Sequence, residues 1–231
     1  MLKVLRLLTK FYYGIKFKEK LDLHKTILRR TNIHVSKNSN KVIFNHVSIY
    51  DSDFLIKGDK NSMSIEKSNH LIYGLSVKIY GENNHLVIEE GAIIYGLRIV
   101  IRGNGCHVSI GSNFCENINS MIVCMGNGNY IEIGDDCMLS ENIDIWNTDS
   151  HQITDISGSI VINTNKNIKI GNHVWIGKNC SILKGVTIGD NSVVGMSSVV
   201  TKDMDSNCIY VGNPARKIHD KISWNRNFNL T

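Results

Sequence analysis

Aliphatic residues recur at every sixth position through the C-terminal part of the chain. These positions are Ile170, Ile176, Ile182, Ile188, Val194 and Val200. Small or β-branched residues stand four positions later in the same phase, at Val174, Cys180, Val186, Ser192 and Ser198. Neither an α-helix nor an alternating strand repeats every six residues. The pattern predicts three short strands per 18-residue coil, and coils stacked so that like residues align in a β-solenoid.

A longer version of the repeat precedes this region. The segments GDKNSMSIE, GENNHLVIE, GNGCHVSIG and GNGNYIEIG begin at Gly58, Gly81, Gly103 and Gly126, and a weaker copy begins at Lys37. We interpret them as the same coil with a short loop added at one corner. Asparagine recurs at the fourth position of three copies, at Asn61, Asn84 and Asn129, where stacked side chains can bond coil to coil. The aliphatic phase falters once, at Glu116.

These repeats predict one all-β domain of about eight coils over residues 36–205. Residues 1–35 are expected to form a basic amphipathic segment, partly helical, that covers one end. Residues 206–231 are expected to form the C-terminal cap. Because a solenoid has flat exposed faces, a homo-oligomer is also expected.

Composition narrows the class of protein further. The six cysteines (Cys106, Cys115, Cys124, Cys137, Cys180 and Cys208) show no CxxC pairing, which favours buried reduced thiols over disulfides or a metal site. No run of 18 apolar residues exists, and residues 1–10 lack the features of a secretion signal. A cytoplasmic protein is therefore expected.

The net charge of +5 is concentrated at the N-terminus. Residues 1–30 hold nine Lys and Arg against two Asp and Glu, so the remainder of the chain is slightly acidic. That balance argues against a body that binds polyanions such as nucleic acid. The basic segment suits peripheral contact with the inner face of an anionic membrane. A helix packed on the solenoid with a solvated basic face is the alternative.

The six-residue phase breaks at a histidine. The series Ile133, Leu139 and Ile145 predicts an aliphatic residue at position 151, where His151 stands, followed by an irregular stretch over 152–167. Long insertions in solenoids are often functional. In an extended strand residues 149 and 151 point the same way, so Asp149 is a candidate to orient the imidazole of a general base. The alternative is a structural histidine.

Three strings in this part of the chain carry a resemblance to a known family. NTDSHQI, GNHVWIGKNCSILKGVTIGDNSVVGMSSVVTKD and VGNPARKI resemble the hexapeptide-repeat acyltransferases, in particular the galactoside, maltose, nodulation-factor and surface-polysaccharide O-acetyltransferases. The resemblance implies a left-handed parallel β-helix and acetyl-CoA as co-substrate, with no metal. It is strong over roughly residues 126–219.

The resemblance also implies roles for individual residues. His151 matches the base that takes the proton from an acceptor hydroxyl as this attacks the thioester directly. Asp149 has no counterpart in the galactoside type, so its role as the orienter of the ring rests on geometry, and acceptor binding is its alternative role. The residues matched to acetyl-CoA binding are Trp175 for the CoA arm, Lys178 and Met196 for main-chain contacts, and Thr201, Lys202 and Arg216 for the nucleotide end. Asn129 and Asn147 are the candidate acceptor-binding residues.

The family builds its active sites between the subunits of a trimer, so a homotrimer is implied. We expect an O-acetyltransferase acting on a sugar hydroxyl, in a bacterial capsule, O-antigen or related glycan. The sequence names neither the sugar nor the hydroxyl. Two alternatives stay open: a streptogramin-type enzyme that acetylates xenobiotics, and a non-enzymatic solenoid scaffold.

Overall fold

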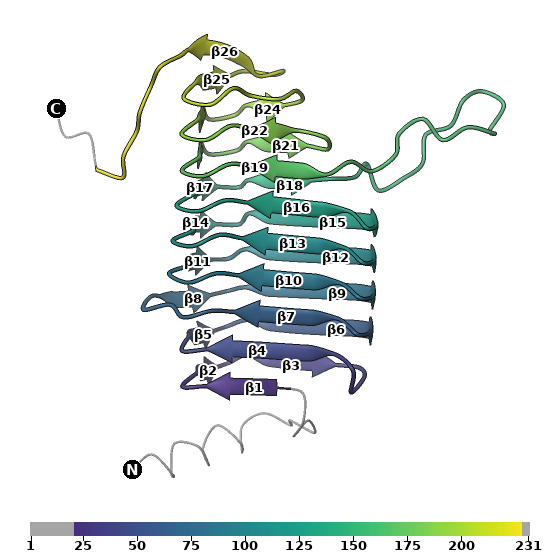
Figure 1. The fold of residues 1–231 in the computed structure, drawn as a ribbon, viewed down its shortest axis with the longest axis vertical. Helices are drawn as coiled ribbons and strands as arrows, with labels where there is room; N and C mark the ends of the chain where they lie inside the picture. The colour runs from purple at the N-terminus through teal and green to yellow at the C-terminus, as the bar shows by residue number, and fades with distance from the viewer. Residues whose placement is uncertain (1–20, 228–231) are drawn as a thin grey trace.

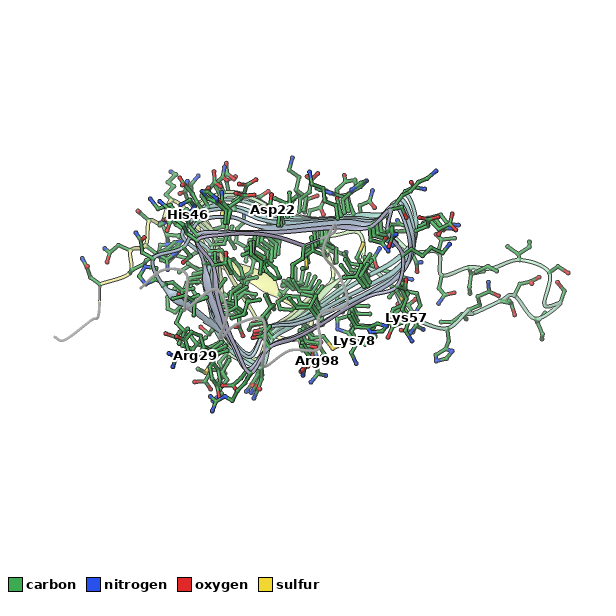
Figure 2. All side chains as sticks on the ribbon, turned by 90° about the horizontal axis from the view of Figure 1, so that it is seen from below. Asp22, Arg29, His46, Lys57, Lys78 and Arg98 are labelled. Carbon is green, nitrogen blue, oxygen red and sulfur yellow. The ribbon has the colours of Figure 1, made fainter. Side chains whose placement is uncertain are left out.

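In the computed structural model, residues 21–227 are described and form a parallel β-helix (Figure 1). The chain passes from a strand of face A to one of face B, then to one of face C, and returns to face A one coil further on. Seen along its axis, the prism is triangular, with apolar side chains filling the interior (Figure 2). Within residues 21–227, no helix is long and apolar enough to cross a membrane.

The three faces are parallel sheets, with one antiparallel pair at the C-terminal end of face B. Face A consists of β1 (Leu21–His24), β4 (Lys41–Asn45), β7 (Ser62–Ile65), β10 (His85–Ile88), β13 (His107–Ile110), β16 (Tyr130–Ile133), β19 (Ile168–Ile170) and β22 (Thr187–Ile188). Face B consists of β2 (Ile27–Arg29), β5 (Ser48–Tyr50), β8 (Leu71–Tyr73), β11 (Ile93–Tyr95), β14 (Cys115–Ile118), β17 (Met138–Glu141), β20 (Trp175–Ile176), β23 (Val193–Val194), β25 (Ile209–Val211) and β26 (Arg216–His219). Face C consists of β3 (Asn32–Val35), β6 (Asp53–Asp59), β9 (Ser76–Glu82), β12 (Arg98–Asn104), β15 (Met121–Asn127), β18 (Asp144–Trp146), β21 (Ser181–Leu183) and β24 (Val199–Val200).

The six-residue phase is the inward face of these strands. All six aliphatic residues from Ile170 to Val200 are buried, and so are the five small or β-branched residues in the second phase. The six cysteines are unpaired; Cys115 is half-buried and the other five are buried. The predicted all-β solenoid is therefore confirmed.

The β-helix begins earlier than the boundary at residue 36 that the repeats suggested. Residues 21–35 form β1, β2 and β3, and Leu28 and Val35 are already part of the core. The repeat was missed here because this first coil carries few inward aliphatic residues. The expected amphipathic segment of residues 1–35 is therefore strand from residue 21 on, and its residues 1–20 lie outside the described residues.

Close stacking of the coils explains the glycine and asparagine columns at the corner from face C to face A. Gly81 has φ +113°, and a Cβ there would overlap the carbonyl oxygen of Gly103 on the next coil. The amide Nδ2 of Asn61 donates to Oδ1 of Asn40 at 3.0 Å, and Nδ2 of Asn84 donates to Oδ1 of Asn61 at 3.0 Å. The coil-to-coil asparagine bonds are thus confirmed over these coils.

Two segments leave the prism. Residues 147–167, between β18 and β19, form a hairpin that projects far from the corner between faces C and A (Figure 1). The C-terminal strap, residues 224–227, is bound at the corner between faces A and B. There the Trp224 ring stacks on His173 with centroids 4.0 Å apart, and Arg226 Nη2 contacts Asp136 Oδ1 at 2.8 Å.

Glu116 explains the single faltering position in the phase. Its side chain points into the core in line with Ile94 and Leu139, and it is fully buried. Oε2 accepts a hydrogen bond from the Tyr95 N–H at 3.0 Å, and Oε1 accepts one from the Ser120 N–H at 3.2 Å. Burial raises the pKa of this carboxyl to about 6, although both hydrogen bonds act in the opposite direction.

This shift makes the stability of the β-helix depend on pH. A carboxyl with a raised folded-state pKa stabilises the fold most at low pH, and the contribution is lost as pH rises from the ordinary pKa of a glutamate, 4.5, through about 6. The stability of the wild type relative to Glu116→Gln should therefore fall by about 2 kcal/mol across that interval. Denaturant midpoints of both proteins at a series of pH values measure it. Glu116→Leu, which also lacks the titrating group, should stay at a constant offset from Glu116→Gln. A wild-type difference that is flat with pH would contradict the prediction.

Candidate active site

The predicted catalytic histidine lies where the chain leaves the prism. β18 ends at Trp146, Asn147 is still part of the wall, and Ser150 adopts a positive φ of 65°. The His151 N–H donates to the carbonyl of Asp149 at 2.7 Å, which closes a tight turn. His151 is exposed at the base of the projecting hairpin, with its ring available to solvent.

The structure does not place Asp149 against the His151 ring. Its Oδ2 atom accepts hydrogen bonds from Lys184 Nζ and, at 2.8 Å, from Asn163 Nδ2. The orienting role proposed for Asp149 assumed an extended strand from 149 to 151. The positive φ of Ser150 turns the chain between them, so this geometry was wrong. Asp149 instead anchors the base of the hairpin.

Lys184 and Asn163 are site residues that sequence reasoning missed. The hydrogen bond from Lys184, assisted by the one from Asn163, lowers the pKa of Asp149 despite partial burial. Asn163 Nδ2 also donates to the carbonyl of His151 at 2.8 Å, and Lys184 Nζ donates to the carbonyl of Asn163 at 3.2 Å. Asp149, Asn163 and Lys184 together fix the backbone that carries His151. The signal available in the sequence was the position of Lys184, directly after the strand stacked on β18.

The structure buries one of the two predicted acceptor residues, Asn147, and leaves the other, Asn129, half-buried. Asn147 is fully buried; its Oδ1 accepts from the Met125 N–H at 2.7 Å and its Nδ2 donates to the Met125 carbonyl at 3.0 Å. Asn129 Nδ2 donates to Asn167 Oδ1 at 3.0 Å, where the hairpin rejoins the prism. The amide of Asn147 thus joins two coils from a fully buried position, and its assignment as an acceptor contact was wrong. The role of Asn129 stays a prediction, with its amide N–H engaged by Asn167.

The residues expected at the CoA arm gather on face B and at the corner that leads to face C. Trp175 is 37 % exposed on β20, and its Nε1 donates to Ser140 Oγ at 3.3 Å. Lys178 and Met196 occupy this corner on successive coils, because the Ser197 N–H donates to the Lys178 carbonyl at 2.8 Å. Lys178 Nζ also forms an ion pair with Glu141 Oε2 at 2.6 Å.

The main-chain donors at this corner are open. Among residues 21–227, no acceptor is found for the N–H groups of Lys178 and Met196. The corner between faces A and B differs, because there the N–H of Ser112 donates to Asp135 Oδ1 and that of Asn172 donates to Asp190 Oδ1, both at 2.7 Å. An open N–H pair is a suitable contact for the amides of a bound arm or for a developing oxyanion.

The cations expected at the nucleotide end lie further along the prism. Thr201 and Lys202 are exposed directly after β24, at the same corner as Lys184 and one coil beyond it. Arg216 is exposed on β26, where its Nη1 donates to the Ala215 carbonyl at 3.0 Å. Within the described part of the chain, neither Lys202 nor Arg216 forms an ion pair.

Within one protomer, the proposed base and the residues expected at the CoA arm therefore lie at different corners of the prism. His151 stands at the corner between faces C and A, whereas Lys178 and Met196 stand at the corner between faces B and C. The β-helix of hexapeptide coils, the histidine at the root of an inserted hairpin and the open main-chain donors define the class of hexapeptide-repeat transferases.

Comparisons with known proteins agree with this class. The family described as bacterial transferase hexapeptide (six repeats) matches residues 167–202. A polysialic acid O-acetyltransferase of Neisseria meningitidis is 34% identical over 151 residues, which are 56% of this chain and 68% of the relative. The chain belongs to this family of hexapeptide-repeat acetyltransferases.

Two further similarities bear on the specific relatives. A polysialic acid O-acetyltransferase of Escherichia coli O1:K1 / APEC is 38% identical over 96 residues, which are 42% of this chain but only 31% of that protein. The crystal structure of a polySia-specific acetyltransferase superposes with a TM-score of 0.73 at 29% identity, covering 91% of both chains. The likeness to that structure thus extends over nearly the whole β-helix.

The Asp149–Lys184 contact predicts how firmly the base of the hairpin is held. Lys184→Met removes the cation, and since Asp149 is partly exposed the contact is worth only about 1 kcal/mol. We therefore expect proteolytic cleavage within residues 149–163 to become about fivefold faster under conditions where opening is in equilibrium. Lys202→Met is the matched control, since Lys202 occupies the same corner without contacting Asp149. Equal cleavage rates of the two variants would contradict the anchoring role.

Proposed function

We propose that this chain transfers an acetyl group from acetyl-CoA to a hydroxyl of a sugar in a surface glycan, with His151 as the general base. The neutral imidazole takes the hydroxyl proton as the oxygen attacks the thioester carbonyl. The carbon–sulfur bond then breaks, and CoA leaves as the thiol after taking up the proton. No covalent enzyme intermediate is needed.

The placement of His151 is the observation that carries this proposal. The residue stands where the six-residue phase is interrupted, lies exposed at the root of the hairpin, and is held there by a backbone that Asn163 and Lys184 secure. A structural histidine would be expected to have its ring engaged. Among the described residues, no hydrogen-bond partner is found for the His151 ring, which leaves it available to a substrate hydroxyl.

The corner that bears Lys178 and Met196 supports the donor side of the reaction. Their open N–H groups suit the main-chain contacts that the family resemblance implies, and an oxyanion formed at the thioester carbonyl needs such donors. Trp175 offers an exposed ring surface beside them for the apolar part of the CoA arm. Lys202 and Arg216 supply charges suited to phosphates.

The separation of the two corners supports a homotrimer with active sites between protomers. A three-fold axis repeats one head-to-tail contact and closes the ring. Such an arrangement brings the hairpin corner of one protomer to the open-donor corner of the next, which a single prism cannot do. The proposed trimer is therefore a requirement for activity.

The names of the relatives support a glycan acceptor. Two of them are polysialic acid O-acetyltransferases, and the superposable structure is specific for polySia. We therefore place sialylated chains first among the acceptors to test. An enzyme that acetylates a streptogramin would use the same base and the same acetyl donor. Only a comparison of different acceptors can therefore distinguish it from a glycan acetyltransferase.

Release of free thiol from acetyl-CoA tests the proposal. Wild-type protein should release thiol only with an acceptor present, and His151→Ala should lower kcat by about 10²–10⁴-fold while CoA binding is retained. His70→Ala, which changes another exposed histidine away from the hairpin, is the matched control and should keep the wild-type rate. The panel comprises polysialic acid, galactosyl and amino-sugar glycans, and a streptogramin.

The outcomes separate the alternatives. Full activity in His151→Ala would mean that His151 is structural and another group is the base. Turnover of the streptogramin alone would replace the glycan acceptor by a xenobiotic. Failure of the wild type to bind CoA would favour the non-enzymatic scaffold.

A further inference from the structure

Face C carries a group of exposed cations below the coil that bears His151. Lys57 lies on β6, Lys78 on β9, and Arg98 and Arg102 on β12. Figure 2, which looks along the axis, places Lys57, Lys78 and Arg98 on one side of the triangle, with Lys57 next to the corner from which the hairpin leaves. Within residues 21–227, none of the four forms an ion pair with an acidic side chain. We call these four residues, together with Tyr80, the face C track.

The strand register staggers the charges. Lys57 is aligned with Tyr80 and Tyr80 with Arg102, so an aromatic ring separates these two cations. Lys78 is aligned with Leu55 and Val100, and Arg98 with Ser76 and Met121, so no two cations stack on adjacent coils. With coils about 4.8 Å apart and about 3.3 Å per residue, neighbouring cations are about 8 Å apart. This stagger avoids stacked like charges. Among the described residues, none of the four cations is held in an ion pair, so all four are open to an anionic ligand.

The track also contains an aromatic ring, that of Tyr80. The Arg102 guanidinium lies over the Tyr80 ring, 5.2 Å from its centroid, which fixes both side chains on the face. Tyr80 is half-buried, so part of the ring is left for contact with a ligand. A ring surface flanked by guanidinium and ammonium groups suits a sugar that carries a carboxylate.

The track leads to the proposed catalytic residue. Arg102 is aligned with Met125 on β15, and the Met125 N–H is bonded to Asn147 on the coil from which His151 projects. The four strands of face C directly below this coil, β6, β9, β12 and β15, are seven residues long, whereas β18 has three, so these coils form a broad shelf beneath the hairpin. From the coil of Lys57 to that of His151 the distance along the axis is about 19 Å.

Four acidic groups lie on or beside face C, and one of them is paired with a lysine outside the track. Asp53 Oδ1 accepts from Asn32 Nδ2 at 2.8 Å, and Asp59 forms an ion pair with Lys37 at 3.5 Å. Glu82 lies at the corner beyond Tyr80, and Asp144 lies at the edge of face C on the coil of the hairpin. The sequence argued against polyanion binding from the net charge of the body. That sum averages over all faces and does not show how the cations of this face are arranged in a row.

We propose that the face C track binds an acidic polysaccharide, a chain with repeated carboxylates, and guides it to His151. The proposal rests on the proposed function and deepens it by assigning the surface of this chain that would hold the acceptor polymer. Carboxylates engage Lys57, Lys78, Arg98 and Arg102, sugar rings lie along Tyr80, and a hydroxyl further along the same chain reaches the imidazole. Chains shorter than about 19 Å cannot occupy the whole track and the base together.

Direct binding of polysialic acid tests the track without requiring turnover. The full chain should bind it with an affinity that falls as salt rises, and Lys78→Gln/Arg102→Gln should bind at least about tenfold more weakly. Lys41→Gln/Lys169→Gln is the matched control, because it removes the same charge from exposed positions on face A. It should bind like the wild type. The thermal unfolding of all three proteins should coincide, since the four side chains are exposed.

Kinetics on short and long acceptors separate this inference from the proposed function. With long sialic acid chains the track variant should raise KM about tenfold and leave kcat unchanged, and with a sialic acid dimer both proteins should behave alike. Equal binding by the track variant and the face A control would overturn the track. So would binding of neutral dextran or duplex DNA as tightly as polysialic acid. Turnover of a glycan without binding at the face C track would overturn the track but leave the proposed acetyltransferase function intact. Binding at the track without any release of thiol would support the track but overturn the proposed acetyltransferase function.

Discussion

Everything in this protein depends on one contact repeated along the axis: the parallel alignment of each coil on the next. The register sets every residue above its equivalent, so a requirement at one coil becomes a requirement at all of them. Gly58, Gly81 and Gly103 each leave no room for a Cβ beside the carbonyl of the following glycine. Asn40, Asn61 and Asn84 pass one hydrogen bond from coil to coil. Glu116 shows the cost of an exception, since a carboxyl in an aliphatic column has to be satisfied by two backbone N–H groups.

This alignment is also why so much of the fold could be predicted from the sequence. A column of like residues appears in the chain as a fixed period, and the inward positions from Ile170 to Val200 are buried as the period indicates. The first coil was not predicted, because residues 21–35 contribute only Leu28 and Val35 to the buried hydrophobic core. A period can be recognised only where enough positions repeat it.

The site was predicted less completely, for a different reason. His151 could be found because it interrupts a period, but its surroundings obey none. Asp149 and Lys184 are 35 residues apart and meet through the hairpin, so no local pattern joins them. Asn147 was taken for a ligand contact, yet the structure uses its amide to replace a backbone bond where the wall opens. Positions that compensate for a break in the repeat look functional in the sequence and prove to be structural.

The C-terminal strap has a consequence for how the molecule comes apart. Contacts between coils join residues about 20 positions apart, and a one-dimensional stack bound only by its neighbours can fray from its last coil. Trp224 reaches back 51 residues to His173, and Arg226 reaches back 90 residues to Asp136. The last coils therefore cannot unfold until the C-terminal strap has detached. Their unfolding becomes one cooperative step instead of gradual fraying from the end.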